Sequence, residues 1–249
     1  MYDAKETRET KKQVTEYLVQ NHFKDCGGSH VVLLPSESPL DIPLLYQHGK
    51  VNRSTVLDCI YDPFKSHLLG STKNKSLYYD VHLKRTLKRE IKDTEFIDNC
   101  IKSHYCDIRD YCPTDLNIRC MYIDTCNLYE TGFGEWLAKI DSCLENDARV
   151  IFNFVFKGEP TNVNNWSDEM DCAFRLVNIS EDLGKSRKRE IAVAMNDLLK
   201  TVNTIIKDSK YVPVEAISYK GDKTMSMRMG VIVLKKQSDN KGVDYGMLQ

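Results

Sequence analysis

Short apolar runs recur along the chain, and polar segments with a helical period separate them. The run Val31–Leu34 ends at Pro35, and further runs lie at 55–61, 105–108, 120–123 and 150–156. Strands that are buried on both faces of a parallel sheet carry such uninterrupted apolar stretches. The pattern therefore predicts five strands in a buried sheet.

Between these runs, apolar residues recur at the three- and four-residue spacing of amphipathic helices. The spacing predicts helices at 2–24, 40–46, 76–101, 136–144 and 187–208. Pro43 suits the first turn of the second helix, because proline lacks the N–H that a helix leaves unpaired there. Strands alternating with helices are typical of an α/β domain with a mostly parallel sheet.

The end of the chain has a different pattern. Two runs that alternate apolar and polar residues, at 212–217 and 227–233, flank Gly221 and Asp222 and favour an antiparallel hairpin. We therefore expect three segments. They are an N-terminal helix at residues 1–27, one α/β domain at 28–236 and a flexible tail at 237–249.

The composition indicates a globular protein. Of the 249 residues 41% are hydrophobic, 35 are basic and 36 are acidic, so the formal net charge is −1. These values support a packed core and exclude a uniformly basic surface. No apolar run approaches the roughly 18 residues that span a bilayer, and the polar N-terminus lacks the apolar stretch of a secretory signal. We expect an intracellular protein with no membrane partner.

Nine cysteines raise the question of a disulfide or zinc site. Cys100, Cys106 and Cys112 follow one another at six-residue intervals, as do Cys120 and Cys126. Zinc sites usually place two ligands within two to four residues of each other, and no such pair occurs. The spacing favours reduced thiols packed as small apolar side chains, so we predict no metal site.

Basic residues gather in two helical segments although the whole chain is almost neutral. They are Lys84, Arg85, Lys88 and Arg89 in the first segment, and Lys185, Arg187, Lys188 and Arg189 in the second. Each group could contact nucleic acid or an acidic protein, or form a solvated helix surface. Cations at the start of the helix 187–208 oppose its dipole, which favours a contact role there.

The order of elements, with acidic residues at the strand ends, resembles class I S-adenosylmethionine-dependent methyltransferases over residues 28–236. The resemblance implies a Rossmann-like, mostly parallel sheet that is flanked by helices and ends in an antiparallel hairpin. It also implies that S-adenosylmethionine is the cofactor and binds beyond the carboxyl ends of the strands.

The resemblance assigns cofactor contacts to the strand ends. Asp62, after the second strand, would hold the ribose hydroxyls, since a carboxylate accepts two hydrogen bonds at once. Asp107 would contact the adenine amino group, and Ile108 would lie against the ring. The loop after the first strand would approach the methionine part of the cofactor, and its matching residues are Pro35, Ser36, Glu37, Ser38 and Asp41, with no glycine among them.

The stretch Asp124–Asn127 follows the fourth strand, where the family has its substrate-facing motif. Asp124 would position the substrate or the sulfonium, and Asn127 is the second candidate catalytic residue. Amino-directed methyltransferases have two prolines after the first residue of this motif. In this chain Cys126 and Asn127 replace those prolines, so N6-adenine or N4-cytosine methylation is not supported.

Two other functions stay open from the sequence. The glycine-free first loop fits a catalytically inactive Rossmann-like binding or assembly subunit. The stretch that begins at Asp124 also resembles the opening strand of PIN or NYN-type ribonucleases, which hold magnesium or manganese on carboxylates. Glu159, Asp168 and Asp171 are available as the further ligands of such a site.

Overall fold

The computed structural model describes residues 5–23, 26–35, 39–61, 75–113, 117–128, 132–156, 198–206, 209–220 and 228–238. Its helices and strands are α1 (Lys5–His22), β1 (His30–Leu33), α2 (Asp41–Gln47), β2 (Val56–Tyr61), α3 (Lys75–Glu90), α4 (Thr94–Cys100), β3 (Ile101–Tyr105), η3 (Ile108–Asp110), β4 (Ile118–Leu128), α5 (Gly132–Ile140), η4 (Asp141–Cys143), β5 (Leu144–Phe156), β6 (Ser209–Lys220) and β7 (Arg228–Ser238). Residues 198–205 are also helical.

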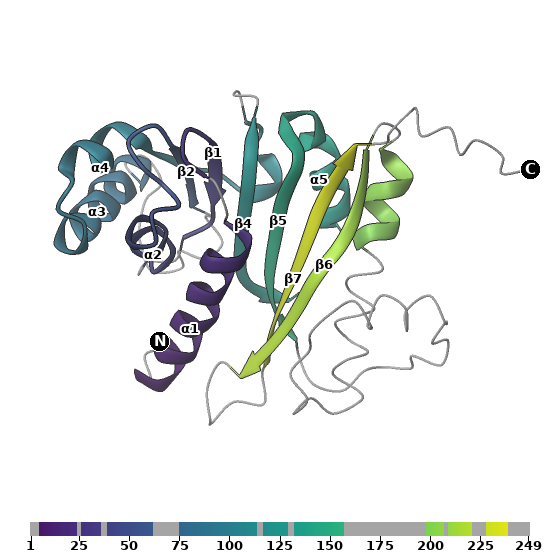
Figure 1. Cartoon of the computed structure of the whole chain (residues 1–249), viewed down its shortest axis with the longest axis horizontal. Helices are drawn as coiled ribbons and strands as arrows, with labels where there is room; N and C mark the ends of the chain where they lie inside the picture. The colour runs from purple at the N-terminus through teal and green to yellow at the C-terminus, as the bar shows by residue number, and fades with distance from the viewer. Residues whose placement is uncertain are drawn as a thin grey trace, which may run out of the picture.

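The strands form one sheet in the order β3-β2-β1-β4-β5-β7-β6. Figure 1 labels all of these strands except β3. β1 to β5 are parallel, and β7 runs antiparallel to both of its neighbours, β5 and β6. The predicted fold class, a mostly parallel Rossmann-like sheet with a closing antiparallel hairpin, is therefore confirmed. Within the ranges above, no helix is long and apolar enough to cross a membrane.

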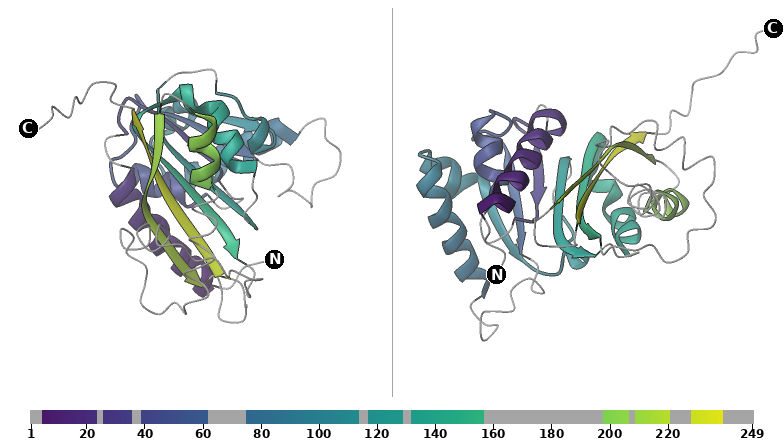
Figure 2. Two further views of the ribbon diagram at one scale, coloured as in Figure 1. Left: turned by 90° about the vertical axis from the view of Figure 1, so that its right-hand side faces the viewer. Right: turned by 90° about the horizontal axis from the view of Figure 1, so that it is seen from below.

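Helices cover both faces of the sheet (Figure 2). Val31 and Leu33 of β1 pack on the face that α1, α2, α3 and α4 cover, which we call the α1 face. Val32 and Leu34 pack on the other face, against α5 and the helical residues 198–205. Because alternate residues of a strand point to opposite faces, an uninterrupted apolar run such as Val31–Leu34 serves both cores at once.

Several boundaries differ from the sequence prediction. The predicted helix 136–144 is α5 at Gly132–Ile140, and Leu144 begins β5. The predicted helix 76–101 is two helices, because Asp93 caps α4 by accepting a hydrogen bond from the backbone N–H of Phe96 at 3.0 Å. The predicted strand 105–108 is wrong in position, since β3 is Ile101–Tyr105 and Asp107 and Ile108 lie in the turn after it. β3 lies at the edge of the sheet and is only partly buried, so it lacks the apolar run of a central strand.

Gly134 lies where α5 packs against the helical residues 198–205. A Cβ atom at this position would lie 2.7 Å from the Cβ of Thr201 and 2.8 Å from its Cγ2. Gly132, two residues earlier in α5, has nothing within 4 Å of such an atom. The glycine at 134 therefore permits a close helix approach.

We expect Gly134→Ala to lower the free energy of unfolding by about 1–3 kcal/mol, the usual cost of overpacking a core. Urea unfolding monitored by circular dichroism measures this loss. Gly132→Ala is the matched control and should cost nothing, because the added methyl group has free space. In a Thr201→Gly background the cost of Gly134→Ala should fall, because only the carbonyl oxygen of Leu198, 3.3 Å from the added atom, then remains in tight contact. An equal cost in both backgrounds would contradict the close approach.

Candidate active site

The parallel strands bring their carboxyl ends to one edge of the sheet. β6 runs in the same direction as β5, so the arrowhead of β6 marks this edge at the bottom of Figure 1. Pro35 follows β1, Asp107 follows β3, and Asp124 lies in β4. Ligands of open α/β sheets bind at this edge, because the loops diverge there.

Asp124 is the centre of a buried polar cluster at this edge. It is 2% exposed, and its register partner in β5 is Asn153. The amide Nδ2 of Asn153 donates a hydrogen bond to Asp124 Oδ1 at 3.2 Å, and the ammonium of Lys11 forms an ion pair with Oδ2. Helix α1 thus supplies a positive charge to a carboxylate that the sheet buries.

The cluster lies on the α1 face. Cys120 and Tyr122 of β4 and Ile151 of β5 pack on this face, and Asp124 and Asn153 continue the same alternation. The sequence prediction named Asp124 but missed Lys11 and Asn153. Asn153 had a visible signal, as the single polar residue inside the apolar run 150–156, whereas Lys11 is one charge among many in α1.

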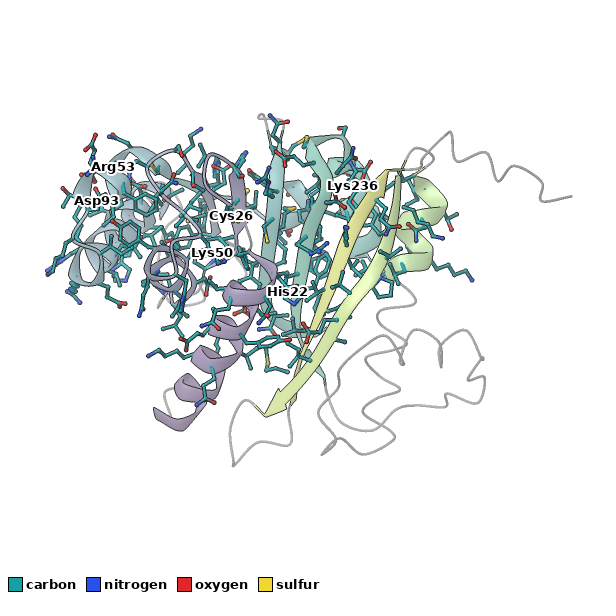
Figure 3. All side chains as sticks on the ribbon, viewed as in Figure 1. His22, Cys26, Lys50, Arg53, Asp93 and Lys236 are labelled. Carbon is teal, nitrogen blue, oxygen red and sulfur yellow. The ribbon has the colours of Figure 1, made fainter. Side chains whose placement is uncertain are left out.

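A second polar contact fixes α1 against the hairpin. Nε2 of His22, which Figure 3 labels on α1, lies 2.6 Å from Oε2 of Glu215 in β6. The hydroxyl of Tyr17 donates to Oε1 of the same carboxylate at 2.7 Å. The hydrogen bond to Glu215 raises the pKa of Tyr17 to about 12. Burial acts to raise the pKa of Glu215, but the contacts from His22 and Tyr17 outweigh it and the pKa is lowered. The anchored helix holds Lys11 near Asp124.

The turn after β3 carries the two residues predicted to contact adenine. Asp107 Oδ1 accepts hydrogen bonds from the backbone N–H and the Nε of Arg109, at 2.9 and 3.0 Å, and Oδ2 accepts one from Nη2 at 2.7 Å. These bonds lower the pKa of Asp107. Ile108 is buried against the opposite core. The turn therefore presents a fixed, charged carboxylate at the edge of the sheet.

A buried network beneath this turn ties three strands together. Asp58 of β2 receives a hydrogen bond from the hydroxyl of Tyr111, and Nε2 of His30 in β1 lies 2.8 Å from Oδ2. Nε2 of His104 in β3 lies 3.1 Å from Oδ1. Burial acts to raise the pKa of Asp58, but its contacts with His104, His30 and Tyr111 outweigh it and hold the pKa well below its usual range. The network fixes Tyr111 and with it the turn.

The first loop is described only in part. Pro35 is buried after β1, and Asp41 is buried in the first turn of α2. Ser36, Glu37, Ser38 and Asp62 lie outside the described residues, as does the side chain of Asn127. Cys59 of β2 lies close to Asp41, and burial, helped by the carboxylates of Asp41 and Asp58, raises the pKa of its thiol. Cys59 is therefore an unreactive core side chain.

The predicted basic stripe of α3 divides into two groups. Lys84 forms an ion pair with Asp80 at 3.3 Å, and Lys88 forms one with Asp98 of α4 at 2.9 Å. Arg85 and Arg89 point outward and are exposed. The second predicted group, at 185–189, lies outside the described residues.

The described contacts of Asp124 include an ammonium and an amide. Within the described part of the chain, no cluster of three metal-ligating side chains occurs. Glu159, Asp168 and Asp171, the further ligands of the ribonuclease interpretation, lie outside it. A cation paired with Asp124 favours a site that receives a polar or charged organic group.

Searches with the sequence matched no protein family model and no curated protein. The structure, in contrast, is similar to many solved structures. A putative transferase, PH0793 from Pyrococcus horikoshii, matches with a TM-score of 0.50 and 10% identity over 91% of this chain and 63% of that protein. A geranyl diphosphate methyltransferase in complex with SAM matches with a TM-score of 0.51 and 10% identity over 92% of this chain and 86% of that one.

TYW2 from P. horikoshii, in complex with MeSAdo, matches with a TM-score of 0.50 and 10% identity over 90% of this chain. The chain spans 62% of TYW2, so it covers less than two thirds of this protein and of PH0793. At these identities the likeness concerns the fold alone. The fold is that of class I S-adenosylmethionine-dependent methyltransferases, as the order of elements predicted.

Proposed function

We propose that the chain binds S-adenosylmethionine at the carboxyl edge of β1, β2 and β3 and transfers its methyl group to an acceptor held at Asp124. The observation that carries this proposal is the buried cluster of Asp124, Asn153 and Lys11, which lies at the ligand-binding edge of a methyltransferase-like sheet. Several proteins of similar fold, including TYW2 and the geranyl diphosphate methyltransferase, were solved with this cofactor or a related compound.

The residues at the edge fit such a ligand. A carboxylate has about four acceptor positions, and Asp107 uses three of them for Arg109, so one on Oδ2 is left for the adenine amino group. Asp124 offers a negative charge where the methyl group would be transferred. The sulfonium supplies an electrophilic methyl group, and the chain must bring an acceptor lone pair close to it.

Asp124 would accept a hydrogen bond from the N–H or O–H of the acceptor and so orient its lone pair toward the methyl group. Asn153 holds this carboxylate in place through Oδ1. Lys11 stabilises its charge from α1 before the acceptor arrives. Because Asp124 is buried, each of these interactions is stronger than it would be in water.

Calorimetric titration with S-adenosylmethionine and with S-adenosylhomocysteine tests the proposal. We expect both to bind in the range of about 1 µM to 1 mM that is typical of enzyme ligands. Asp107→Ala should weaken both equally by about tenfold, since both contain adenine and a hydrogen bond to a charged group is lost. Asp110→Asn, at an exposed neighbouring acid, is the control and should change neither affinity.

Binding of neither compound to the folded wild-type chain would contradict the proposal. An inactive binding or assembly subunit would then be the better interpretation. Equal loss of affinity in Asp107→Ala and Asp110→Asn would contradict only the role assigned to Asp107, and not the binding of the cofactor.

A further inference from the structure

The outward face of α3 carries an unusual share of exposed apolar side chains. Leu77, Tyr78 and Val81 are 67%, 53% and 56% exposed. They are three of the five large hydrophobic residues that are exposed within the described part of the chain; the other two, Tyr17 and Ile205, lie on different helices. Scattered exposed apolar residues need no explanation, but a group on one helix marks a contact surface.

The same face carries a straight row of rings and guanidinium groups. Tyr78, His82, Arg85 and Arg89 follow one another at spacings of four, three and four residues, which places them along one line of a helix. The rings of Tyr78 and His82 are almost parallel, with an interplanar angle of 6° and centroids 6.0 Å apart. The row spans about 16 Å along the helix axis, at about 1.5 Å per residue.

Among the described residues, no carboxylate pairs with the arginines of this row. Lys84 and Lys88, on the flanks of α3, are paired with Asp80 and Asp98. No ion pair joins Arg85 or Arg89 to a carboxylate among the residues that the structure describes. The two unpaired guanidinium groups give the row a positive end, while the rings give it an aromatic end.

We propose that this row of α3 binds single-stranded nucleic acid, with a base against Tyr78 and phosphates on Arg85 and Arg89. Aromatic rings beside unpaired cations are the combination by which proteins hold single strands without reading their sequence. An acidic protein would use the arginines but leave the exposed rings without a partner, so we prefer nucleic acid. The inference does not rest on the proposed methyl transfer.

The row and the candidate active site lie on the same side of the sheet. α3 and α1 both cover the α1 face, and Asp124 points to that face. β3 and β4 are three strand positions apart in the sheet.

Fluorescence anisotropy with labelled twelve-nucleotide single strands tests this inference, without cofactor. Arg85→Gln/Arg89→Gln should weaken binding by at least about tenfold and lower the slope of log K against log salt by about 1.4, at about 0.7 per lost phosphate contact. Lys139→Gln/Lys210→Gln removes the same charge from exposed positions on other elements, and it should leave affinity and slope nearly unchanged.

Tyr78 has its own test. Tyr78→Ala should weaken binding about tenfold, since stacking contributes about 1–3 kcal/mol per base, whereas Tyr78→Phe should bind like the wild type. With an abasic strand of the same length, Tyr78→Ala should have no effect.

Three results would overturn the inference. They are no binding by the wild type, equal losses in the arginine pair and the lysine control, or equally tight binding of poly-glutamate. The last result would point to an acidic protein. Because the binding assay contains no cofactor, a negative result in this assay has no bearing on the proposed methyl transfer.

Discussion

Asp124→Asn is expected to reduce methyl transfer by at least about 100-fold while the protein stays folded. The substitution keeps the size and shape of a side chain that the sheet buries, but it removes the charge that Lys11 contacts. It also replaces one acceptor oxygen by an amide that donates, so the acceptor group loses its hydrogen bond. Positioned acid and base groups contribute about 10²- to 10⁴-fold to a reaction.

The measurement is the transfer of tritiated methyl from S-adenosylmethionine to separate RNA, DNA, protein and small-molecule fractions. The fraction that the wild type labels most is then compared between variants. Asp147→Asn is the control, because Asp147 is exposed and pairs only with Lys235 among the residues described. Full activity of Asp124→Asn, or equal losses in the two variants, would contradict the role of Asp124.

Asp58→Ala is expected to lower the free energy of unfolding by about 3–5 kcal/mol. The change leaves His30, His104 and Tyr111 around a buried site that has lost their shared acceptor, and each group left without a hydrogen-bond partner there costs about 1–3 kcal/mol. Asp98→Ala, which breaks the exposed pair with Lys88, should cost less than about 1 kcal/mol. Urea unfolding at neutral pH compares the two variants.

The same network predicts how acid affects stability. The pKa of Asp58 is lower in the folded chain than in the unfolded chain, so its contribution is present above the unfolded value of about 3.9. It is lost as the pH falls toward the folded value. We therefore expect the difference in stability between the wild type and Asp58→Ala to shrink below about pH 4. A difference independent of pH would contradict the charged network.

The sheet was predictable because its central strands have a distinctive sequence pattern. β1 and β2 are buried on both faces, so nearly every residue is apolar and the strand ends at a proline or an acid. The position of β3 was predicted wrongly because an edge strand needs no continuous apolar run. The polar residues Lys102 and His104 interrupt the apolar pattern of this strand. The break before α4 was missed because Ile91, Phe96 and Ile97 continue the apolar pattern across the cap at Asp93.

Of the three residues in the candidate site, only Asp124 was predicted from the sequence. Asp124 directly follows an apolar run, and an acid at the carboxyl end of a parallel strand is a candidate ligand-binding residue because ligands bind at that edge. Lys11 meets it because α1 folds back over the sheet, and no local pattern encodes that contact. The same holds for Asp58 and Tyr111, which are 53 positions apart in the chain and join only when the turn after β3 closes over β2.

The location of bound cofactor tests the central proposal most directly. Labelled S-adenosylmethionine is cross-linked to the wild-type chain by ultraviolet light, and the labelled peptides are identified by mass spectrometry. We predict labelling within residues 33–41, 105–111 or 122–128, at the carboxyl edge of the sheet, and its loss when S-adenosylhomocysteine is in excess. Labelling confined to residues 198–238, or labelling that the competitor does not reduce, would contradict the proposal.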